Sequence, residues 1–504
     1  MKTRLATGMA PLFAPICTSA DLREIEAAAQ AENPSPTLMQ RAGLAAADRA
    51  AEVMQDTTRS VLVVAGPGNN GGDAFEVALH LKQRFHRVDV LFVGERAKFS
   101  TDAKDALRRW QSADGTLLGP FPTDARRRYG LIVDGLFGIG LSRKLEGRAA
   151  SLVESINASG VPVLALDVPS GINADTGEVM GAAVHASDTI TFIALKPGLL
   201  TLDGPDHCGR LTVDALGLAV AGLKEPRGHL LDAAALANVL APRPLNFHKG
   251  QAGNAVVLGG ASGMTGAALI AGRAALACGA GRVYVGLLDG ALPLDPLQPE
   301  LMLRSANDPF PEGATIAIGP GLGQGDAGRS VLERALSCAS PLLVDADALN
   351  LIGADRSLAA SVAARSAPTL MTPHPAEAAR LLGQRTAEVQ ADRVHAALAM
   401  AKRFNAFVAL KGNGTVIADA RGHWWINSTG HPGMASAGMG DALTGLVTGL
   451  LAQGAAPLEA LLAAVWLHGS AGDEVAKAQG GVLGTTASDV IVQARRVLNR
   501  ALRP

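Results

Sequence analysis

The sequence predicts an α/β protein of two domains, each built on a mainly parallel sheet covered by helices. Short apolar runs rich in β-branched residues, such as VLVVAG from Val61 and NAVVLGG from Asn254, alternate with longer Ala- and Leu-rich segments typical of helices. Uninterrupted apolar strands between helices indicate a parallel sheet that is buried on both faces. The charged, proline-containing stretch KEPRGHLLDAAALANVLAPRP from Lys224 separates two such series, and 504 residues exceed one ordinary domain. We therefore expect one domain over residues 1–225 and another over residues 226–504.

The composition excludes several classes of partner. With 45 Lys and Arg against 46 Asp and Glu, the chain has no strong net field that would attract nucleic acid or anionic lipid. The four cysteines lie far apart and form no C-x-x-C pair, so free thiols are expected rather than a zinc site or a disulfide scaffold. No apolar run is long enough to cross a bilayer, and Pro11 and Pro15 interrupt the N-terminal stretch, which lacks the apolar core of a signal peptide. We expect a cytoplasmic homo-oligomer that acts on small molecules, without a nucleic-acid or membrane partner.

The stretch VLVVAGPGNNGGDAFEVALHL combines a strand, a glycine-rich turn and a helix. Gly66, Gly68 and Gly71 satisfy G-x-G-x-x-G, the spacing of a dinucleotide-binding turn. In such a turn the helix N-terminus receives a pyrophosphate, and Asp73 would place a negative charge where that anion should lie. Two interpretations of Asp73 follow: it caps the helix at its positive end, or it belongs to a functional cluster.

Further polar residues follow the neighbouring predicted strands. Asp134 comes late in LIVDGLFGIG, and Asp167 and Ser170 lie in LALDVPSG. Ligands of open α/β sheets bind at the carboxyl ends of the strands, where these side chains and those of Asn70 and Asp73 are expected to meet. Carboxylates, an amide and a hydroxyl are suited to hold a hard cation, and they are equally suited to acid/base chemistry. The pattern predicts a functional cluster of one of these two kinds.

The motifs AGPGNNGGDAF, IVDGLFGIGLSRKLEG and LALDVPSGINADTG, with LMQRAG upstream, together resemble the NAD(P)H-hydrate epimerase family over roughly residues 12–220. The resemblance implies a Rossmann-like three-layer α/β/α domain that interconverts the R and S forms of NAD(P)H hydrated at C6. It implies substrate contacts from Asn69, Asn70, Gly71, Gly72 and Asp73 and from Gly138, Ile139, Gly140, Leu141, Ser142, Arg143 and Lys144, and a potassium ion held by Asn70, Asp134 and Ser170. Asp167 would lie at the nicotinamide end, and we expect it to be the acid/base residue.

The second half contains a phosphate site of another kind. It has no G-x-x-x-x-G-K-[ST] motif, but Gly438, Met439 and Gly440 lead into a helical run that begins near Asp441. Small residues let backbone N–H groups converge at a helix N-terminus and form an anion hole. Asp441 is placed to take a proton from a hydroxyl that is being phosphorylated, or alternatively to serve only as an N-terminal helix charge.

Seven ordered motifs narrow the family of the second half: HKGQAG, GGASGMTGAALIAGRAALACGAGRV, PELM, AIGPGLG, VDADALN, TPHPAEAARLLG and ALKGNGTVIAD. Together with the anion-hole stretch they are similar to the ADP- or ATP-dependent NAD(P)H-hydrate dehydratases of the ribokinase-like superfamily, over roughly residues 228–504. The resemblance implies phosphorylation of the C6 hydroxyl of the S form and elimination of phosphate, with Asp441 as the base and Mg²⁺ and ADP or ATP as cofactors. It implies nucleotide contacts from Lys411, Gly412, Asn413, Gly414, Thr415, Gly438 and Gly440, and hydrate contacts from Ala267, Gly321, Gly323, His374 and Asp441.

Several roles stay open at this point. His374 is either a satisfied, partly buried histidine or a direct contact, and Asp345 and Asp347 either cap a helix, which we favour, or reach magnesium. The leading hypothesis is a bifunctional enzyme of cofactor repair. The alternative is a kinase for a small vitamin precursor fused to a non-catalytic ligand-binding domain, since ribokinase-like folds serve many substrates.

Overall fold

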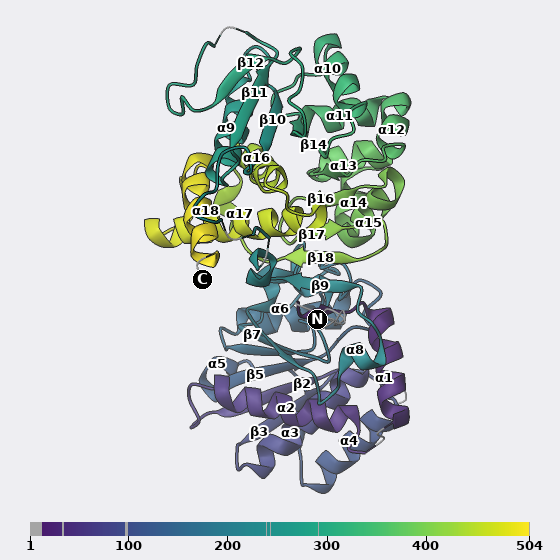
Figure 1. Ribbon diagram of the computed structural model, residues 1–504. Coiled ribbons are helices and arrows are strands. Elements are labelled where there is room, and N and C mark those ends of the chain that lie inside the picture. Colours follow the sequence, from purple (N-terminus) through teal and green to yellow (C-terminus); the bar gives the residue numbers. More distant parts are fainter. Residues whose placement is uncertain are drawn as a thin grey trace, which may run out of the picture. The chain divides into compact units, whose positions relative to one another are not determined.

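The computed structural model describes residues 13–32, 35–95, 99–237, 239–241, 243–290 and 292–502. The chain forms two compact units, the first over Ala14–Gly228 and the second comprising Phe13 and the chain from His229 onward. Each unit has helices packed on a sheet, which confirms the predicted α/β class (Figure 1). Residues 1–12, which include most of the N-terminal stretch considered above, lie outside the described residues.

The first unit contains a parallel sheet in the order β4–β3–β2–β5–β6–β7–β8. Its strands are β2 (Ser60–Ala65), β3 (Val88–Phe92), β4 (Leu117–Leu118), β5 (Tyr129–Gly135), β6 (Val163–Leu166), β7 (Asp188–Phe192) and β8 (Arg210–Asp214), preceded by the short β1 (Pro15–Ile16). Its α-helices are α1 (Ser19–Glu32), α2 (Leu38–Val53), α3 (Asn69–Gln83), α4 (Thr101–Ser112), α5 (Ala125–Arg128), α6 (Gly147–Ala158), α7 (Gly204–Cys208) and α8 (Val220–Leu223). The chain reverses its direction across the sheet between β2 and β5, which is where an open α/β sheet forms its binding crevice.

Alternate residues of β2 enter different cores, as expected for a strand buried on both faces. Val61 and Val63 pack in one core with buried residues of α2, α3 and α4, among them Phe75 and Trp110. Leu62 and Val64 pack in another core with residues of α6. This burial on both faces explains why VLVVA is uniformly apolar.

The second unit is built on strands in the order β9–β18–β17–β16–β15–β14–β13–β10–β11–β12. The strands are β9 (Gly228–Leu231), β10 (Asn254–Gly259), β11 (Arg282–Leu287), β12 (Met302–Ser305), β13 (Thr315–Ile318), β14 (Leu342–Val344), β15 (Thr369–Met371), β16 (Phe407–Leu410), β17 (Thr415–Ala418) and β18 (Trp424–Asn427). The pairs from β12 to β16 are parallel, whereas β16–β17 and β17–β18 are antiparallel. The chain therefore leaves the parallel part of the sheet at β16, directly before the Lys411–Thr415 loop.

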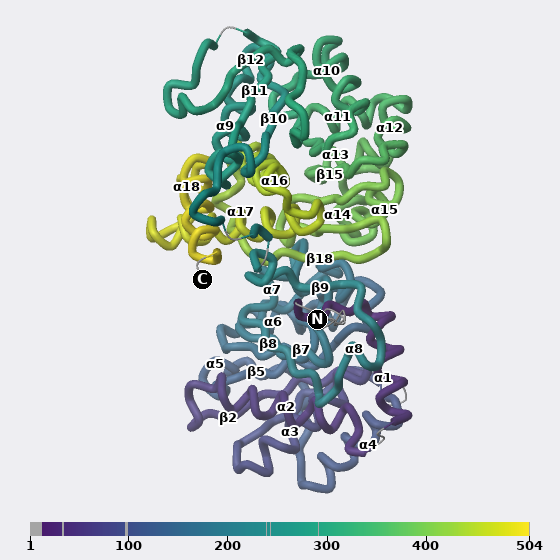
Figure 2. Tube along the Cα trace, in the orientation of Figure 1, coloured from purple at the N-terminus to yellow at the C-terminus, as the bar shows by residue number. Residues whose placement is uncertain are grey.

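Helices cover both faces of this sheet. They are α9 (Thr265–Ala277), α10 (Asp326–Leu336), α11 (Ala346–Ala354), α12 (Arg356–Ala363), α13 (Pro375–Leu382), α14 (Thr386–Ala391), α15 (Arg393–Phe404), α16 (Met439–Ala452), α17 (Pro457–Gln479) and α18 (Ala487–Ala501). The helix α16 packs against α9 and α17, and these helices with α18 form one layer (Figure 2). The helices α10 and α15 pack against β13, β16 and β17. The helix α16 contacts β10, β13 and β14, and Gly440 near its N-terminus lies close to Asp345 after β14 and to Lys411 after β16.

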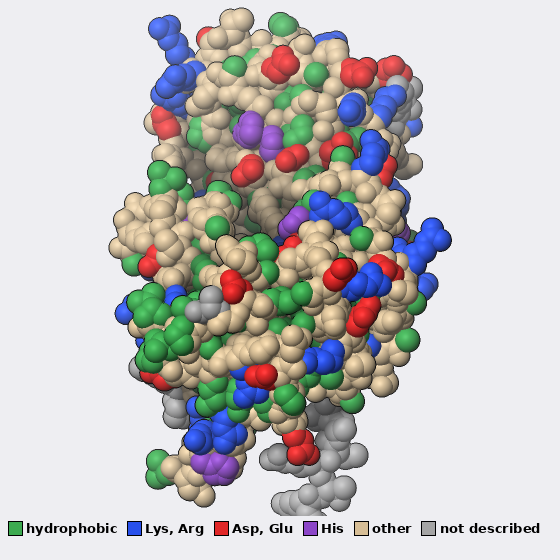
Figure 3. Space-filling view, turned by 90° about the horizontal axis from the view of Figure 1, so that it is seen from above, with side chains coloured by type: hydrophobic (Ala, Val, Ile, Leu, Met, Phe, Trp, Pro, Cys, Tyr) green, Lys and Arg blue, Asp and Glu red, His purple; other side chains and the backbone are tan. Residues whose placement is uncertain are grey.

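The surface charges are mixed, as the balanced composition predicts. Basic and acidic side chains are interspersed over the face shown in Figure 3, and a hollow in that face is bordered by acidic and histidine side chains. Within the described ranges, no helix combines the length and apolarity needed to cross a membrane. All four cysteines are free, as predicted, and Cys17, Cys208 and Cys278 are buried.

Candidate active sites

The glycine-rich turn after β2 is shaped by close backbone packing. A Cβ at Gly66 would lie 1.8 Å from the carbonyl oxygen of Leu136, and one at Gly71 would lie 1.9 Å from the carbonyl oxygen of Gly66. Gly68 has open space around it and forms the N-cap of α3. Two of the three glycines are therefore required because the turn presses against itself and against the end of β5, independently of any pyrophosphate.

Asp73 lies in the second turn of α3 and not at its cap, which Gly68 occupies without a side-chain hydrogen bond. The capping interpretation of Asp73 is therefore wrong. Its carboxyl lines a cavity of about 680 Å³. Burial raises the pKa of Asp73 well above its ordinary value, and the nearby carboxylates of Asp167, Glu26 and Glu76 raise it further, with Lys196 opposing them.

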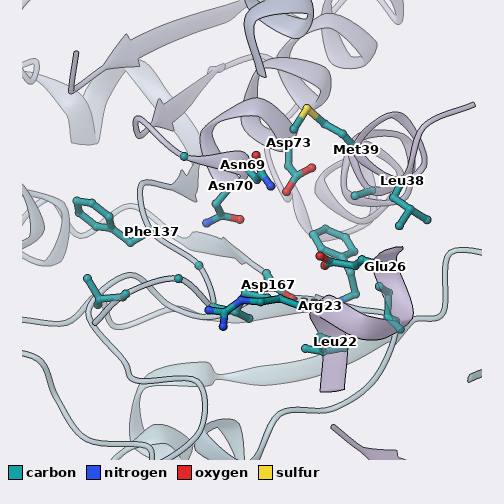
Figure 4. Close-up of a pocket in the computed structure, with 18 of the residues that line it drawn as sticks. Leu22, Arg23, Glu26, Leu38, Met39, Asn69, Asn70, Asp73, Phe137 and Asp167 are labelled. Atoms are coloured by element: carbon teal, nitrogen blue, oxygen red, sulfur yellow. Dashed lines mark hydrogen bonds between the residues drawn. The ribbon is translucent and has the colours of Figure 1, made fainter. Parts of the chain in front are cut away.

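The cavity gathers most of the side chains predicted for the first site. Predicted residues that line it are Asn69, Asn70, Asp73, Gly138, Ile139, Gly140, Leu141, Ser142, Arg143 and Asp167. Gly71 and Gly72 instead pack against Gly66 and Met39, and Lys144 is exposed outside the lining. Figure 4 shows Asp73 and Asn70 projecting from α3 toward the same space as Asp167 and the α1 residue Glu26.

Asp167 directly follows β6 and has a left-handed backbone, with φ at 66°. Its Oδ1 atom accepts hydrogen bonds from the backbone N–H of Phe192 at 3.3 Å and from the hydroxyl of Thr191 at 3.4 Å. It also forms a short ion pair with Lys196, which is only 1% exposed and donates further to Thr191 Oγ1 at 2.7 Å and to the Phe192 carbonyl at 2.8 Å. The carboxylate is therefore fixed in place by a buried ammonium group.

Asn70, Asp134 and Ser170 carry the amide, carboxylate and hydroxyl oxygens that a hard cation prefers. Asp134 is fully buried at the end of β5 and accepts hydrogen bonds from the Ser170 hydroxyl at 2.6 Å and the Ser170 N–H at 2.9 Å. Burial raises the pKa of Asp134, whereas these hydrogen bonds lower it. Both polar atoms of the buried Asn70 amide lack a partner among the described residues. A buried amide without hydrogen-bond partners has an unfavourable desolvation free energy. A cation coordinated by the Asn70 oxygen would offset part of it.

The second site is formed around the N-terminus of α16. Gly438 has a φ of 84° and is the N-cap of the helix, so the chain enters the helix through a left-handed turn. A Cβ at Gly440 would lie 3.3 Å from Lys411 Nζ and 3.8 Å from Asp345 Oδ2. The first N–H groups of a helix lack partners within the helix, so this glycine turn presents donors to an anion close to a lysine.

Asp441 stands in the first turn of α16 among other charged groups. Burial raises the pKa of Asp441 to about 6, and the charge of Asp345 adds to this effect while Lys411 opposes it. Lys411 Nζ lies 2.8 Å from Asp345 Oδ1, and the Thr444 hydroxyl donates to Asp345 Oδ2 at 2.7 Å. A carboxyl with such a pKa is ionised at neutral pH and still basic enough to accept a proton.

Neither Asp345 nor Asp347 caps a helix with its side chain, which is the role that we favoured. Asp345 occupies the N-cap position of α11 but makes no capping bond, because its oxygens bind Lys411 and Thr444. Asp347 accepts the backbone N–H of Gly323 at 2.9 Å and thereby holds the loop after β13. The capping interpretation was wrong because it considered only the local sequence.

Residues predicted for the hydrate lie on neighbouring loops. Gly321 and Gly323 have left-handed backbones after β13, and the Ala261 N–H donates to the Gly321 carbonyl at 2.7 Å, which joins this loop to the one preceding Ala267. His374 is the N-cap of α13, where its Nδ1 accepts the N–H of Ala376 at 3.1 Å. This bond favours the satisfied-histidine interpretation, although the ring is half-exposed.

The loop Lys411–Thr415, which is predicted to bind the nucleotide, is held by a residue that the motifs did not indicate. Arg393, at the start of α15, is 2% exposed and donates to the carbonyls of Leu410 at 3.1 Å, Lys411 at 3.3 Å and Gly414 at 3.4 Å. A Cβ at Gly412 would lie 2.9 Å from the same guanidinium. An arginine within a helical run has no distinguishing spacing, so no sequence signal was available for it.

Two family models match different halves of the chain. The family model of the YjeF-related protein N-terminus matches residues 35–198, and that of NAD(P)H-hydrate dehydratase matches residues 255–494. Bifunctional NAD(P)H-hydrate repair enzymes of Coxiella burnetii and Escherichia coli are each 38% identical, over 92% of this chain and 94% and 89% of theirs. Among solved structures, the ADP/ATP-dependent NAD(P)H-hydrate dehydratase of Bacillus subtilis is 31% identical over 54% of this chain and 98% of its own, with a TM-score of 0.47.

The fold and the family models define a two-domain α/β enzyme with a YjeF-related first half and a hydrate-dehydratase second half. The chain belongs to the family of bifunctional NAD(P)H-hydrate repair enzymes. This confirms the family predicted from the motifs and the pairing of two activities in one chain.

Proposed function

We propose that the first unit interconverts the R and S forms of NADH or NADPH hydrated at C6, and that the second unit returns the S form to NAD(P)H. The second unit would transfer a phosphoryl group from ADP or ATP to the C6 hydroxyl and then eliminate phosphate. The observation that supports this most directly is Asp441, a basic carboxylate in the first turn of α16 beside the ion pair of Lys411 with the buried Asp345. Hydroxide is a poor leaving group and phosphate a good one, so phosphorylation makes the elimination feasible.

Asp441 would take the proton of the C6 hydroxyl as its oxygen attacks the transferring phosphoryl group. The N–H groups at Gly438–Gly440 and the ammonium of Lys411 would stabilise the charge on that group. Lys411–Thr415 would bind the donor, and Ala267, Gly321, Gly323 and His374 would border the hydrate. We propose that these roles follow the motif positions given above.

Two cations are part of the proposal. We propose that K⁺ binds Asn70, Asp134 and Ser170. The unpartnered Asn70 amide packs against Gly138, the neighbour of Phe137, whose N–H donates to the Ser170 hydroxyl, and this hydroxyl donates to the buried Asp134 carboxylate. Mg²⁺ would bind with the phosphates of the donor, as it commonly does. Asp347 is the better protein ligand for it, because Asp345 is paired with the ammonium of Lys411, whereas Asp347 accepts neutral hydrogen bonds from the Gly323 N–H and the Gln324 side chain. K⁺ supplies a fixed positive charge near the substrate, and Mg²⁺ neutralises phosphate charge.

The experiment that tests the proposal follows a mixture of both hydrate epimers with the protein and either ADP or ATP by chromatography. Both epimers should disappear and NAD(P)H should form. With Asp167→Asn, the S form should disappear at the normal rate while the R form persists. Normal loss of the R form in that variant would contradict an epimerase in the first unit. Release of a stable phosphorylated product, without NAD(P)H, would favour the vitamin-precursor kinase instead.

A further inference from the structure

The cavity of the first unit contains a second carboxyl that faces Asp167. Asp73 projects from α3 and Asp167 from the end of β6, and both border the same space (Figure 4). Their electrostatic coupling is direct, since the charge of Asp167 is among the causes that raise the pKa of Asp73. Two carboxyl groups on different elements of one cavity can act on two sides of a bound ring.

We propose that Asp73 and Asp167 are the two proton-transfer residues of the epimerase, with Asp73 as the acid, Asp167 as the base and Lys196 as the residue that positions Asp167. This assignment rests on the proposed function of the first unit. It gives Asp73 a chemical role beyond substrate contact, and it adds Lys196, which the sequence motifs did not include.

The two carboxyl groups have opposite surroundings. Asp167 accepts a charge-assisted hydrogen bond from Lys196 and neutral ones from Phe192 and Thr191, and these bonds hold its carboxylate in place. The buried ammonium of Lys196 in turn requires a negative partner, since an uncompensated buried charge is strongly unfavourable.

Asp73 has no hydrogen-bond or ion-pair partner among the described residues, and its oxygens face the cavity. The charged groups that shift its pKa are Glu26 on α1, Glu76 on its own helix and Asp167 after β6, which raise it, and Lys196 after β7, which lowers it. Arg23 on α1, Asp102 on α4 and Arg143 also line the cavity. Burial together with the like charges of Glu26, Glu76 and Asp167 favours the protonated carboxyl, which is the form that donates a proton.

An independent observation indicates that the cavity is built to bind a ligand. Asn70 lies one turn before Asp73 on α3 and also lines the cavity, yet neither its Oδ1 nor its Nδ2 has a partner among the described residues. The residue is only 7% exposed. A buried amide without partners beside two carboxyls points to a polar group that occupies the space between them.

The proton movements balance as follows. In the hydrate, C6 carries a hydroxyl and is bonded to the ring nitrogen N1. Asp73 gives its proton to that hydroxyl, the C6–O bond breaks with loss of water, and the lone pair of N1 forms a C6=N1 double bond. Water then adds to the opposite face of C6 while Asp167 takes one of its protons, and the π electrons return to N1. One proton has moved in total, so Asp73 is now ionised and Asp167 is protonated. This form can catalyse the reverse conversion, or proton exchange with solvent can restore the starting protonation of both residues.

The first test compares Asp73→Asn with the wild-type protein in the rate of epimerisation, with the uncatalysed rate subtracted. We expect kcat to fall by about 10²- to 10⁴-fold, the usual contribution of a general acid, with KM nearly unchanged. In the wild type, kcat should fall as rising pH removes the proton of Asp73, and this alkaline limb should be absent from the variant. Asp48→Asn, at an exposed carboxyl of α2 paired with Arg84, is the matched control and should keep full activity.

The outcomes separate this assignment from the proposed function. An Asp73→Asn variant with normal kcat and a raised KM would show that Asp73 only binds substrate, and would overturn the acid assignment while the epimerase stands. A wild-type protein that leaves the ratio of epimers unchanged would overturn both.

The second test concerns Lys196. Lys196→Gln removes the buried ammonium that holds Asp167 in place, so kcat for epimerisation should fall while KM for the hydrate stays nearly unchanged. A normal kcat in this variant, or a change in KM alone, would overturn the positioning role. Thr191→Val removes one acceptor of Lys196 and keeps the charge, so it provides a milder variant with a smaller fall in kcat if Lys196→Gln does not fold.

Discussion

The two sites use the same position in the fold, the carboxyl ends of parallel strands, but they differ in how their polar groups are paired. In the first unit, the Asn70 amide has no partner among the described residues, and Asp73 faces like charges. In the second unit, Asp345 is bonded to Lys411 and Thr444, and Asp347 to a backbone N–H. Asp167 in the first unit is also paired, with Lys196, but within the described part of the chain Asn70 and Asp73 leave polar atoms free to bind a cation and to give a proton. The paired carboxylates of the second unit are suited to hold a phosphoryl group in fixed geometry. The difference in pairing thus corresponds to the difference in proposed chemistry.

The largest expected effect separates the two sites completely. Asp441→Asn should lower nucleotide-dependent recovery of NAD(P)H from the S hydrate by about 10²- to 10⁴-fold, because the variant lacks the general base. Epimerisation by the first unit should be unchanged in the same preparation, which serves as the internal control. The measurement is NAD(P)H formation together with the ratio of epimers. Full dehydration by this variant would contradict the assignment of the base.

The pH dependence should distinguish the sites by its sign. Asp441 must be ionised to act, and its pKa is raised to about 6, so kcat/KM for dehydration should be level above pH 6 and fall about tenfold per unit below it. Epimerisation should instead decline toward alkaline pH, because burial raises the pKa of Asp73 and the acid form is the active one. Profiles of both reactions on one preparation would check this. Parallel profiles would remove the contrast between the sites.

The cation site of the first unit can be tested through potassium dependence. Asn70→Ala should raise the K⁺ concentration needed for half-maximal epimerisation by at least about tenfold, the scale on which changes near a metal site act. Dehydration of the S form should show no such change. Asn69→Ala, at the exposed neighbour in the same turn, should alter KM for the hydrate but leave the K⁺ dependence as in the wild type. Equal K⁺ dependence in all three proteins would contradict the proposed ligand set.

The smallest expected effect concerns Arg393 in the second unit. Lysine keeps the charge but loses the planar fork that reaches the carbonyls of Leu410, Lys411 and Gly414, so Arg393→Lys should raise KM for the nucleotide by about three- to tenfold. KM for the hydrate should be unchanged. Arg403→Lys is the control on the same helix, since Arg403 bonds the carbonyl of Leu381 outside the loop. A similar change in both variants would indicate loss of helix stability rather than loop positioning.

The sequence predicted the folds because strands and helices here follow their hydrophobic patterns closely. VLVVA is apolar at every position and is buried on both faces, and the glycines after it form the expected turn into α3. The rule that ligands bind at strand ends also placed Asp73 and Asp167 on one cavity. That rule worked because parallel strands bring their ends together whatever their separation in sequence.

Predictions from the sequence were wrong or incomplete where a side chain bonds a partner that is distant in the chain. Asp345 has the position of a helix cap but bonds Lys411 and Thr444, which are distant in the chain. Lys196 follows β7 as Asp167 follows β6, so the strand-end rule could have found it had it been applied to basic residues as well. Arg393 lies within a helix, where only the fold reveals that its guanidinium reaches the loop predicted to bind the nucleotide.

The left-handed backbone at Asp167 limits how this position can change during evolution or in a designed library. Asp, Asn and Gly tolerate a φ of 66° far better than other residues, for which such a conformation adds about 1–2 kcal/mol. A glutamate would keep the charge but would strain the chain and move the carboxylate away from Lys196. Among the residue types that this backbone tolerates, aspartate is the only one with a carboxylate. A substitution to asparagine or glycine would keep the backbone unstrained but would remove the negative charge beside Lys196.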